Sequence, residues 1–367
     1  MSDSAAPVPA GDRRAPVPGL VRGSTYGPLS LLDLVTVGEG QTSTHALRAA
    51  AQFADKAERL GYHRFWVAEH HGTAAVASSA PAVLLAHLAA TTRTIRLGSG
   101  GAILTHHHPL VIAEQFGTLH ALHPGRIDLG IGRGPGADPA TARVLRYGAD
   151  APTPDTFSHR IEELTRFLDD DQPPGHPHEG VHAVPGIASA PGGGRPPVWL
   201  LGSSERSALA AGRLGLPFAF GHHFNAKEAV PALERYRQSF RPSAVLDRPY
   251  SMISVTAIAA DTEREARRLA GSGALLTLRV RAGRPGLVPT PDDAERHHYS
   301  KSERHDVESL LSGMVWGTKE SVHAGLQALR QSTGADELMV TGFIHGAEAR
   351  LRSIELIAQA WGLKPAP

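Results

Sequence analysis

Short apolar runs alternate along this chain with longer segments in which apolar residues recur every three or four positions. The first run, at 29–37, reads LSLLDLVTV and is almost continuously apolar, which is typical of a strand buried on both faces. Further runs of this kind predict seven more strands, at 64–68, 95–99, 127–131, 198–201, 217–220, 250–259 and 337–341. Helical spacing predicts the intervening helices, at 44–60, 80–91, from 109 to a stop at 123–125, 158–168, 204–214, 226–240, 263–278, 319–331 and 347–360.

Strand and helix follow one another at a spacing of about 30 residues in the best-defined part, which is typical of parallel βαβ units. Eight strands separated by helices predict an α/β fold, a (β/α)8 TIM barrel with insertions. A doubly wound open sheet is the alternative, because the sequence does not give the order of the strands. We expect a functional site at the carboxyl ends of the strands.

We expect a single domain from 26 to 367. Residues 1–25 are rich in Ala, Pro and Gly and lack the apolar stretch of a signal peptide, which predicts a disordered N-terminal extension. Insertions are predicted near 169–197, which is rich in Pro, Gly and His, and near 280–310. The second of these shows no clean periodicity, so we expect a mobile lid or a disordered segment there. The Gly/Pro/Arg-rich stretch 134–147 is expected to form a loop.

Composition narrows the function classes. The 37 Lys and Arg residues nearly balance the 36 Asp and Glu residues. A net charge of +1 gives no strong positive potential that would attract nucleic acid or an acidic membrane surface. The chain contains no cysteine, which excludes disulfides and thiolate chemistry and fits a cytoplasmic location. The chain has no run of 18 apolar residues, so we expect no membrane span.

Residues able to do chemistry follow several predicted strands. Glu69-His70-His71 closes the second strand, and because neighbouring side chains point to opposite faces, one histidine can enter the barrel mouth while the other packs outward. The alternative is a structural, hydrogen-bonded pair. His106-His107-His108 resembles a metal-binding sequence, but adjacent histidines rarely converge and no spaced ligand set accompanies them, so we expect no metal site.

Glycine-rich turns follow the third and fourth strands. Gly100-Gly101 would let the backbone approach a flat ligand, or form a plain turn. The stretch 130–136 (GIGRGPG) fails the dinucleotide fingerprint, because Pro135 stands where the last glycine should be and the helix-breaking pair 138–139 follows. Its Arg133 is suited to capturing a phosphate, or pairs with a surface carboxylate.

A strand, a turn and a helix start meet at Leu201-Gly202-Ser203-Ser204. Free N–H groups and hydroxyls at a helix N-terminus form an anion site, and ordinary capping by serine is the alternative. The turn 203–207 and Arg133 would lie on the same rim of the barrel. Together they favour a phosphate clamp more than either does alone.

The stretches WVAEHHG, GSGGAIL, HPLVIAEQFGTLHALHPGRIDLGIGRGPG and PVWLLGSSERSALAAGRLGLPFAF resemble the bacterial-luciferase-like flavin-dependent monooxygenases. The resemblance covers most of 29–359 and is closest to actinomycete polyketide-tailoring oxygenases. It implies a TIM barrel, usually a homodimer, that uses reduced FMN and dioxygen. The implied reaction oxygenates an organic metabolite of aromatic polyketide type, by hydroxylation, epoxidation or Baeyer–Villiger insertion.

The resemblance also implies roles for particular residues. His70 falls on the active-site histidine, and Gly100 and Gly101 fall on a pair beneath the flavin whose peptide is often cis. Arg133 falls on the phosphate-binding arginine. Its hydroxyl partners would be Ser204 and Ser207, with Ser203 in place of a carboxylate.

The chain departs from the family pattern at two places near the substrate. Gly132 replaces the reactive cysteine of luciferase, and Thr105-His106-His107 replaces the usual Pro-Asn-His. His222, His223 and Phe224, just past the sixth strand, are candidates for lining the substrate pocket.

We expect a separate flavin reductase to deliver reduced FMN, because the chain has no nicotinamide-binding fingerprint. Two other functions remain open on the same fold, an F420-dependent oxidoreductase and a non-catalytic flavin-binding protein. The fold alone does not separate them.

Overall fold

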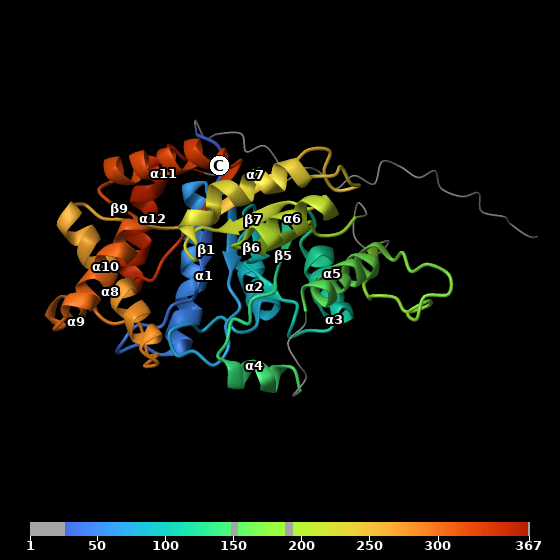
Figure 1. The fold of residues 1–367 in the computed structure, drawn as a ribbon, viewed down its shortest axis with the longest axis horizontal. Coiled ribbons are helices and arrows are strands. Elements are labelled where there is room, and N and C mark those ends of the chain that lie inside the picture. The colour runs from blue at the N-terminus through green and yellow to red at the C-terminus, as the bar shows by residue number, and fades with distance from the viewer. Residues whose placement is uncertain (1–25, 148–152, 188–193, 366–367) are drawn as a thin grey trace, which may run out of the picture.

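Eight parallel strands form a closed barrel in the computed structural model, which describes residues 26–147, 153–187 and 194–365 (Figure 1). The predicted extension 1–25 lies outside these ranges. The strands follow the order β10-β1-β2-β3-β5-β6-β7-β8, and β10 pairs back onto β8 from Glu337↔Met252 to Thr341↔Thr256. This last pairing confirms the TIM barrel and excludes the open sheet. The bounds are β1 Leu29–Asp33, β2 Arg64–Val67, β3 Arg96–Ser99, β5 Ile127–Gly132, β6 Val198–Gly202, β7 Phe218–Gly221, β8 Ser251–Ala259 and β10 Glu337–Thr341.

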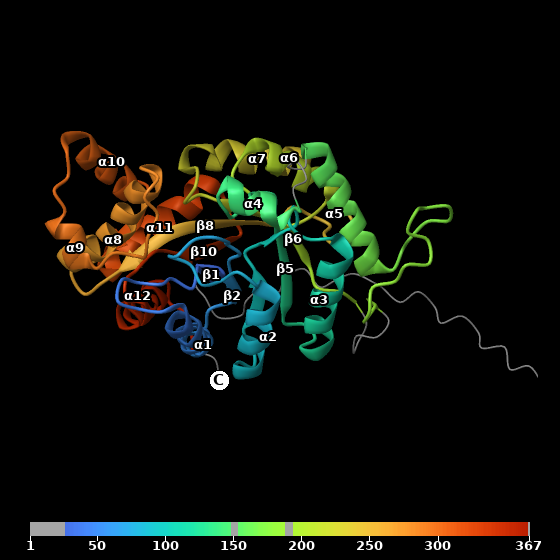
Figure 2. The ribbon, with the colours of Figure 1, turned by 90° about the horizontal axis from the view of Figure 1, so that it is seen from below.

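Helices surround the barrel (Figure 2). Their ends follow local signals: Thr42 caps α1 by accepting the N–H of His45, and Gly61, in the left-handed conformation, ends it. None of the helices in the described ranges is long and apolar enough to cross a membrane. The main helices are α1 Ser43–Leu60, α2 Pro81–Thr91, α3 Pro109–Leu122, α5 Pro154–Asp169, α6 Glu205–Leu214, α7 Ala229–Ser239, α8 Glu263–Arg281, α11 Lys319–Thr333 and α12 Ala347–Ala360.

Both faces of the strands are buried, which explains the near-continuous apolar runs. In β2, Phe65 and Val67 belong to the large cluster between strands and helices. Trp66, between them, belongs to a second cluster with Trp199 and Met339. Since successive side chains of a strand point to opposite faces, the first cluster lies outside the barrel and the second inside it.

The strand predicted at 29–37 is too long. β1 ends at Asp33, whose carboxylate accepts the N–H of Val35 at 2.7 Å, and Val35 has a positive φ of 52°. The residues beyond Asp33 remain buried. The apolar run is therefore longer than the strand, because the residues that follow Asp33 are buried as well.

The stretch predicted as a loop at 134–147 contains a helix, α4 (Pro139–Leu145). Asp138 caps it by accepting the N–H groups of Ala140 and Thr141. The expectation that Asp138-Pro139 prevents a helix was wrong, because proline at a first helical turn lacks only an N–H that has no partner there.

The prediction of a segment without regular structure near 280–310 was also wrong. It contains α9 (Pro291–Arg296) and most of α10 (Lys301–Ser312), which lie beside α8 at one end of the molecule (Figures 1 and 2). Thr290 caps α9, and Ser300 and Glu303 form a capping box at α10. Two short strands were also missed, β4 (Ala102–Ile103) beside β5 and β9 (Val315–Gly317) beside β8.

Candidate active site

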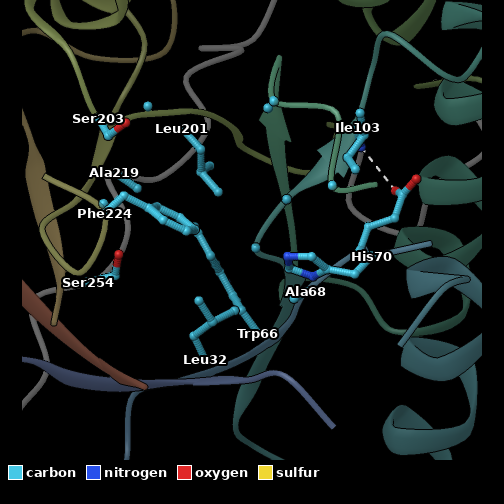
Figure 3. Close-up of a pocket in the computed structure, with 18 of the residues that line it drawn as sticks. Leu32, Trp66, Ala68, His70, Ile103, Leu201, Ser203, Ala219, Phe224 and Ser254 are labelled. Atoms are coloured by element: carbon cyan, nitrogen blue, oxygen red, sulfur yellow. Dashed lines mark hydrogen bonds between the residues drawn. The ribbon is translucent and has the colours of Figure 1, made fainter. Parts of the chain in front are cut away.

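A cavity of about 460 Å³ opens at the carboxyl ends of the barrel strands, within the usual size range of small-ligand sites (Figure 3). Most of its lining side chains are apolar, namely Leu32, Leu34, Trp66, Ala68, Ile103, Pro135, Leu201, Ala219, Phe224 and Met339. The residues with polar side chains along its wall are Glu69, His70, Arg133, Ser203, His223 and Ser254.

The His70 imidazole points into this cavity (Figure 3). Its backbone N–H is bonded to the carbonyl of Ser78, and its Nδ1 is buried without a hydrogen-bond partner among the described residues. Burial lowers the pKa of His70, and the charge of Glu69 offsets part of this effect. The ring is therefore mainly neutral at pH 7 and can hold or release a proton at the cavity wall.

Glu69 points away from His70 and joins three segments of the rim. One carboxylate oxygen accepts Nε2–H of His71 at 2.9 Å and of His107 at 2.7 Å, and the other accepts the N–H of Ile103 at 3.0 Å, the bond drawn in Figure 3. Burial alone would raise the pKa of Glu69, but the hydrogen bonds from His107, His71 and Ile103 keep that pKa below its ordinary value. Glu69 is thus an ionised anchor for the loop before α3.

The histidines at 106–108 do not converge on a metal. His106 donates to the carbonyl of Pro135 at 2.6 Å, and the N–H of His71 donates to the carbonyl of Gly136 at 2.8 Å. Over the described ranges, no group of three or more His, Cys, Asp or Glu side chains has an arrangement that could hold a metal ion. The unusual histidine pair in this loop instead ties the loop after β2 to the loop after β5.

The Gly100-Gly101 peptide is cis, as the resemblance implied, and both glycines line the cavity. A Cβ on Gly100 would lie 2.5 Å from Cδ1 of Leu32. One on Gly101 would lie 2.8 Å from the carbonyl oxygen of Gly130. A side chain at Gly101 would therefore require the backbone to move, and one at Gly100 would require Leu32 to shift.

Gly132 and Arg133 stand at the end of β5. A Cβ on Gly132 would meet nothing within 4 Å, so a larger residue would project into open space. The Arg133 guanidinium is exposed and forms no hydrogen bond or ion pair with any residue that the structure describes. The surface carboxylate considered as its alternative partner is thus not found among them.

Ser204 and Ser207 form a capping box at the start of α6. The two hydroxyls therefore make the capping contacts considered as the alternative, and they lie outside the cavity lining, whereas Ser203 belongs to it. β5 pairs with β6 at Ile131↔Leu200, so Arg133 and the start of α6 follow adjacent strands. The first free N–H groups of α6 and Arg133 lie at neighbouring strand ends, where an anion can meet both.

The predicted substrate-pocket residues separate in the structure. His223 and Phe224 line the cavity, with their ring centroids 4.1 Å apart, whereas His222 does not line it. Both aromatic residues follow β7. They face the cavity from a different strand end than His70.

A buried network of ion pairs lies beneath the cavity and was not predicted from the sequence. Trp66 lines the cavity and donates its indole N–H to Asp128 at 3.2 Å. Asp128 also binds Arg64 at 2.7 Å and Arg96 at 2.5 Å, and Arg64 binds Glu337 at 3.0 Å. The available signal was a charged residue inside each of four predicted strands.

The comparisons with known proteins fit this geometry. A family model described as luciferase-like monooxygenase matches residues 28–337. The chain belongs to the luciferase-like monooxygenase family. It is therefore an oxidoreductase of the monooxygenase type, and the resemblance read from its sequence is confirmed.

Relatives in the luciferase-like monooxygenase family match nearly the whole chain. A luciferase-like monooxygenase of Escherichia coli (strain K12) is 45% identical over 89% of this chain and 95% of its own. The N-acetyl-S-alkylcysteine monooxygenase of Bacillus subtilis (strain 168) is 36% identical over 90% of this chain and 97% of its own. The crystal structure of apo-MsnO8 matches with a TM-score of 0.83 and 36% identity, over 93% of this chain and 100% of that chain.

More distant structures share the fold alone. The oxygenating constituent of 3,6-diketocamphane monooxygenase from Pseudomonas putida, in complex with FMN, has a TM-score of 0.69 at 20% identity, over 93% and 99% of the two chains. An F420-dependent secondary alcohol dehydrogenase has a TM-score of 0.65 at 13% identity, over 92% and 99%. The first of these proteins binds FMN and the second depends on F420.

Proposed function

We propose that this enzyme is an FMN-dependent monooxygenase that uses reduced FMN and dioxygen to oxygenate an organic metabolite. The observation that carries the proposal is Arg133, a guanidinium without a described partner at the mouth of a cavity that is also lined by the backbone of Gly100 and Gly101. A flat ring with a terminal phosphate fits this combination. FMN is the smallest flavin cofactor that presents both.

Each residue of the site would have a separate role in binding FMN or in the reaction. Arg133 and the N-terminus of α6 would hold the phosphate, together with the Ser203 hydroxyl and the free backbone N–H groups of the turn, while Ser204 and Ser207 cap the helix. Gly100 and Gly101 would lie under the ring. Bound reduced FMN would supply the activation of dioxygen. His70 would hold or transfer a proton at its imidazole, while the apolar lining excludes water.

The side chains that line the cavity indicate which class of substrate it would bind. Trp66, Phe224 and Met339 favour an apolar or aromatic compound, in keeping with an intermediate of secondary metabolism of aromatic polyketide type. A second candidate substrate class is S-alkylated cysteine derivatives, which is favoured by the name of the relative that is 36% identical. Oxygenation assays with isotopically labelled dioxygen and one compound of each class would separate the two.

The proposal includes a separate flavin reductase and a homodimer. Helices α2 and α3 are apolar around most of their surface, yet they expose Val83, Val111 and Leu122 to 73%, 43% and 66%. A helix that is apolar on all sides is normally buried, so a second copy of the chain would cover this face. Light scattering at micromolar concentration should give twice the mass of the chain.

The phosphate role of Arg133 tests the proposal. Arg133→Ala should weaken FMN binding by about tenfold to a hundredfold, because a charge-assisted hydrogen bond contributes about 1.5–3 kcal/mol. Binding of riboflavin, which lacks the phosphate, should be unchanged. Arg143→Ala, which removes an exposed arginine of α4 outside the cavity lining, is the matched control. Equal losses for FMN and riboflavin would contradict the proposal, and binding of F420 but not FMN would favour the deazaflavin alternative.

A further inference from the structure

The imidazole of His223 is held in one orientation at the cavity wall. Its Nδ1 lies 3.1 Å from the carbonyl oxygen of Ser254 and 3.1 Å from the hydroxyl of the same residue. The backbone N–H of His223 also donates to that carbonyl, at 3.3 Å. Phe224 packs on the ring with centroids 4.1 Å apart and planes at 45°. These contacts from β8 and from the neighbouring residue fix the plane of the ring.

The contact with Ser254 also fixes the tautomer. A carbonyl oxygen only accepts hydrogen bonds, so Nδ1 of His223 must carry the proton. The hydroxyl of Ser254 lies 3.3 Å from the carbonyl of Phe220, to which it donates, and this leaves its oxygen to accept from Nδ1. In the neutral ring, Nε2 is then a bare acceptor.

The neutral form of His223 prevails at pH 7. Burial lowers its pKa to about 4, with the hydrogen bond to Ser254 acting in the opposite direction and the charges of His222 and His70 adding to the decrease. Nε2 has no hydrogen-bond partner among the described residues, and the ring lines the cavity. A lone pair is therefore presented to whatever occupies this part of the cavity.

We propose that Nε2 of His223 accepts a hydrogen bond from a hydroxyl or N–H group of the bound substrate, and that the enzyme thereby prefers neutral, donor-bearing compounds to their methylated analogues and to anions. This inference rests on the proposed function. A methyl ether leaves the lone pair unsatisfied, and a carboxylate repels it. Arg133 is the only Arg or Lys in the described lining and is assigned to the phosphate, so an anionic substrate finds no further cation there.

The tautomer can be tested without any ligand. Nitrogen-15 NMR of the wild-type protein at pH 7, with the signals of His223 assigned by their loss in His223→Phe, should show a protonated Nδ1 and an unprotonated Nε2. A protonated Nε2 would overturn the inference.

The selectivity is tested with the FMN-loaded protein and three probes: 1-naphthol, 1-methoxynaphthalene and 1-naphthoate. Calorimetry should show 1-naphthol binding about tenfold tighter than either of the others, the usual effect of leaving one buried hydrogen-bonding group unpaired. In His223→Phe, which keeps a ring against Phe224, the three affinities should agree within about twofold. His222→Phe, which changes a neighbouring histidine outside the cavity lining, should keep the tenfold preference.

The outcomes separate the two proposals. If FMN binds but the wild type shows no preference for 1-naphthol, or if the preference survives in His223→Phe, this inference is wrong and the proposed function stands. If the wild type fails to bind FMN, the proposed function is wrong. The same three probes are then measured on the flavin-free protein, where the preference for 1-naphthol again decides the role of His223.

Discussion

Replacing Asp128 with asparagine should destabilise the protein strongly, because this carboxylate lies at the centre of the charge network under the cavity. Asp128 is fully buried and accepts hydrogen bonds from Arg64, Arg96 and Trp66. Asparagine keeps the shape but removes the negative charge. Arg64, which is also fully buried, would keep Glu337 as its only anionic partner in the described network.

Two independent arguments give the size of the effect. Burial would raise the pKa of Asp128, but the charges of Arg64 and Arg96 hold it at about 2, against an ordinary value of 3.8. At about 1.4 kcal/mol for each pH unit, this difference corresponds to about 2.5 kcal/mol of stabilisation. Removing one partner of a buried ion pair typically costs about 3–5 kcal/mol, because the remaining charge stays buried. We therefore expect the free energy of unfolding to fall by about 3–5 kcal/mol.

Urea unfolding at pH 7, followed by circular dichroism, measures this loss. Asp261→Asn is the matched control, because Asp261 pairs with Arg352 at the surface, and its removal should not change the midpoint measurably. A group with a lowered pKa stabilises the fold above its unfolded value and loses that effect as the pH falls. The difference between wild type and Asp128→Asn should accordingly shrink between pH 4 and pH 2. A loss below about 1 kcal/mol at pH 7 would refute the reasoning.

Two further substitutions test the cavity itself. His70→Ala should leave FMN affinity unchanged but lower the oxygenation rate by about a hundredfold, the usual contribution of a positioned proton donor or acceptor; full turnover in a stopped-flow assay would exclude that role. Gly101→Ala should lower both the melting temperature and FMN affinity, because its Cβ would lie 2.8 Å from a backbone oxygen, whereas Gly132→Ala, which meets open space, should keep both in calorimetry and titration. Equal melting temperatures for the two alanine variants would contradict the packing argument.

The barrel was predictable because each strand is buried on two faces and each helix on one. All eight barrel strands were found from their apolar runs, but their ends were less certain. Val35 is fully buried although it lies beyond β1 with a positive φ, so burial alone could not reveal where β1 ends. Asp138 and Ser300 are N-caps of helices, and such capping residues can be recognised from the local sequence. The low apolar content of α9 and α10 concealed these helices, whereas α4 was missed because Asp138-Pro139 was expected to prevent a helix.

The sequence predicted only those features of the site that depend on residues close together in the chain. Strand alternation predicted that one histidine of the pair His70-His71 enters the barrel mouth while the other packs outward, and in the structure His70 lines the cavity whereas His71 does not. The bond from His107 to Glu69 joins residues 38 positions apart, and no local pattern predicts such a contact. The role of His223 depends in the same way on Ser254, which lies 31 positions later on β8.

One strand links these observations. The residues of β2 and its extension that face the barrel interior include Arg64 in the charge network, Trp66 on the cavity wall and His70 at the mouth. Because side chains alternate along a strand, a shift of β2 by one residue would turn all of them outward at once. The ion pair of Arg64 with Asp128 opposes such a shift, since it would bury two unpaired charges. The network beneath the cavity therefore fixes the register that places the imidazole, although Arg64 itself never reaches the cavity.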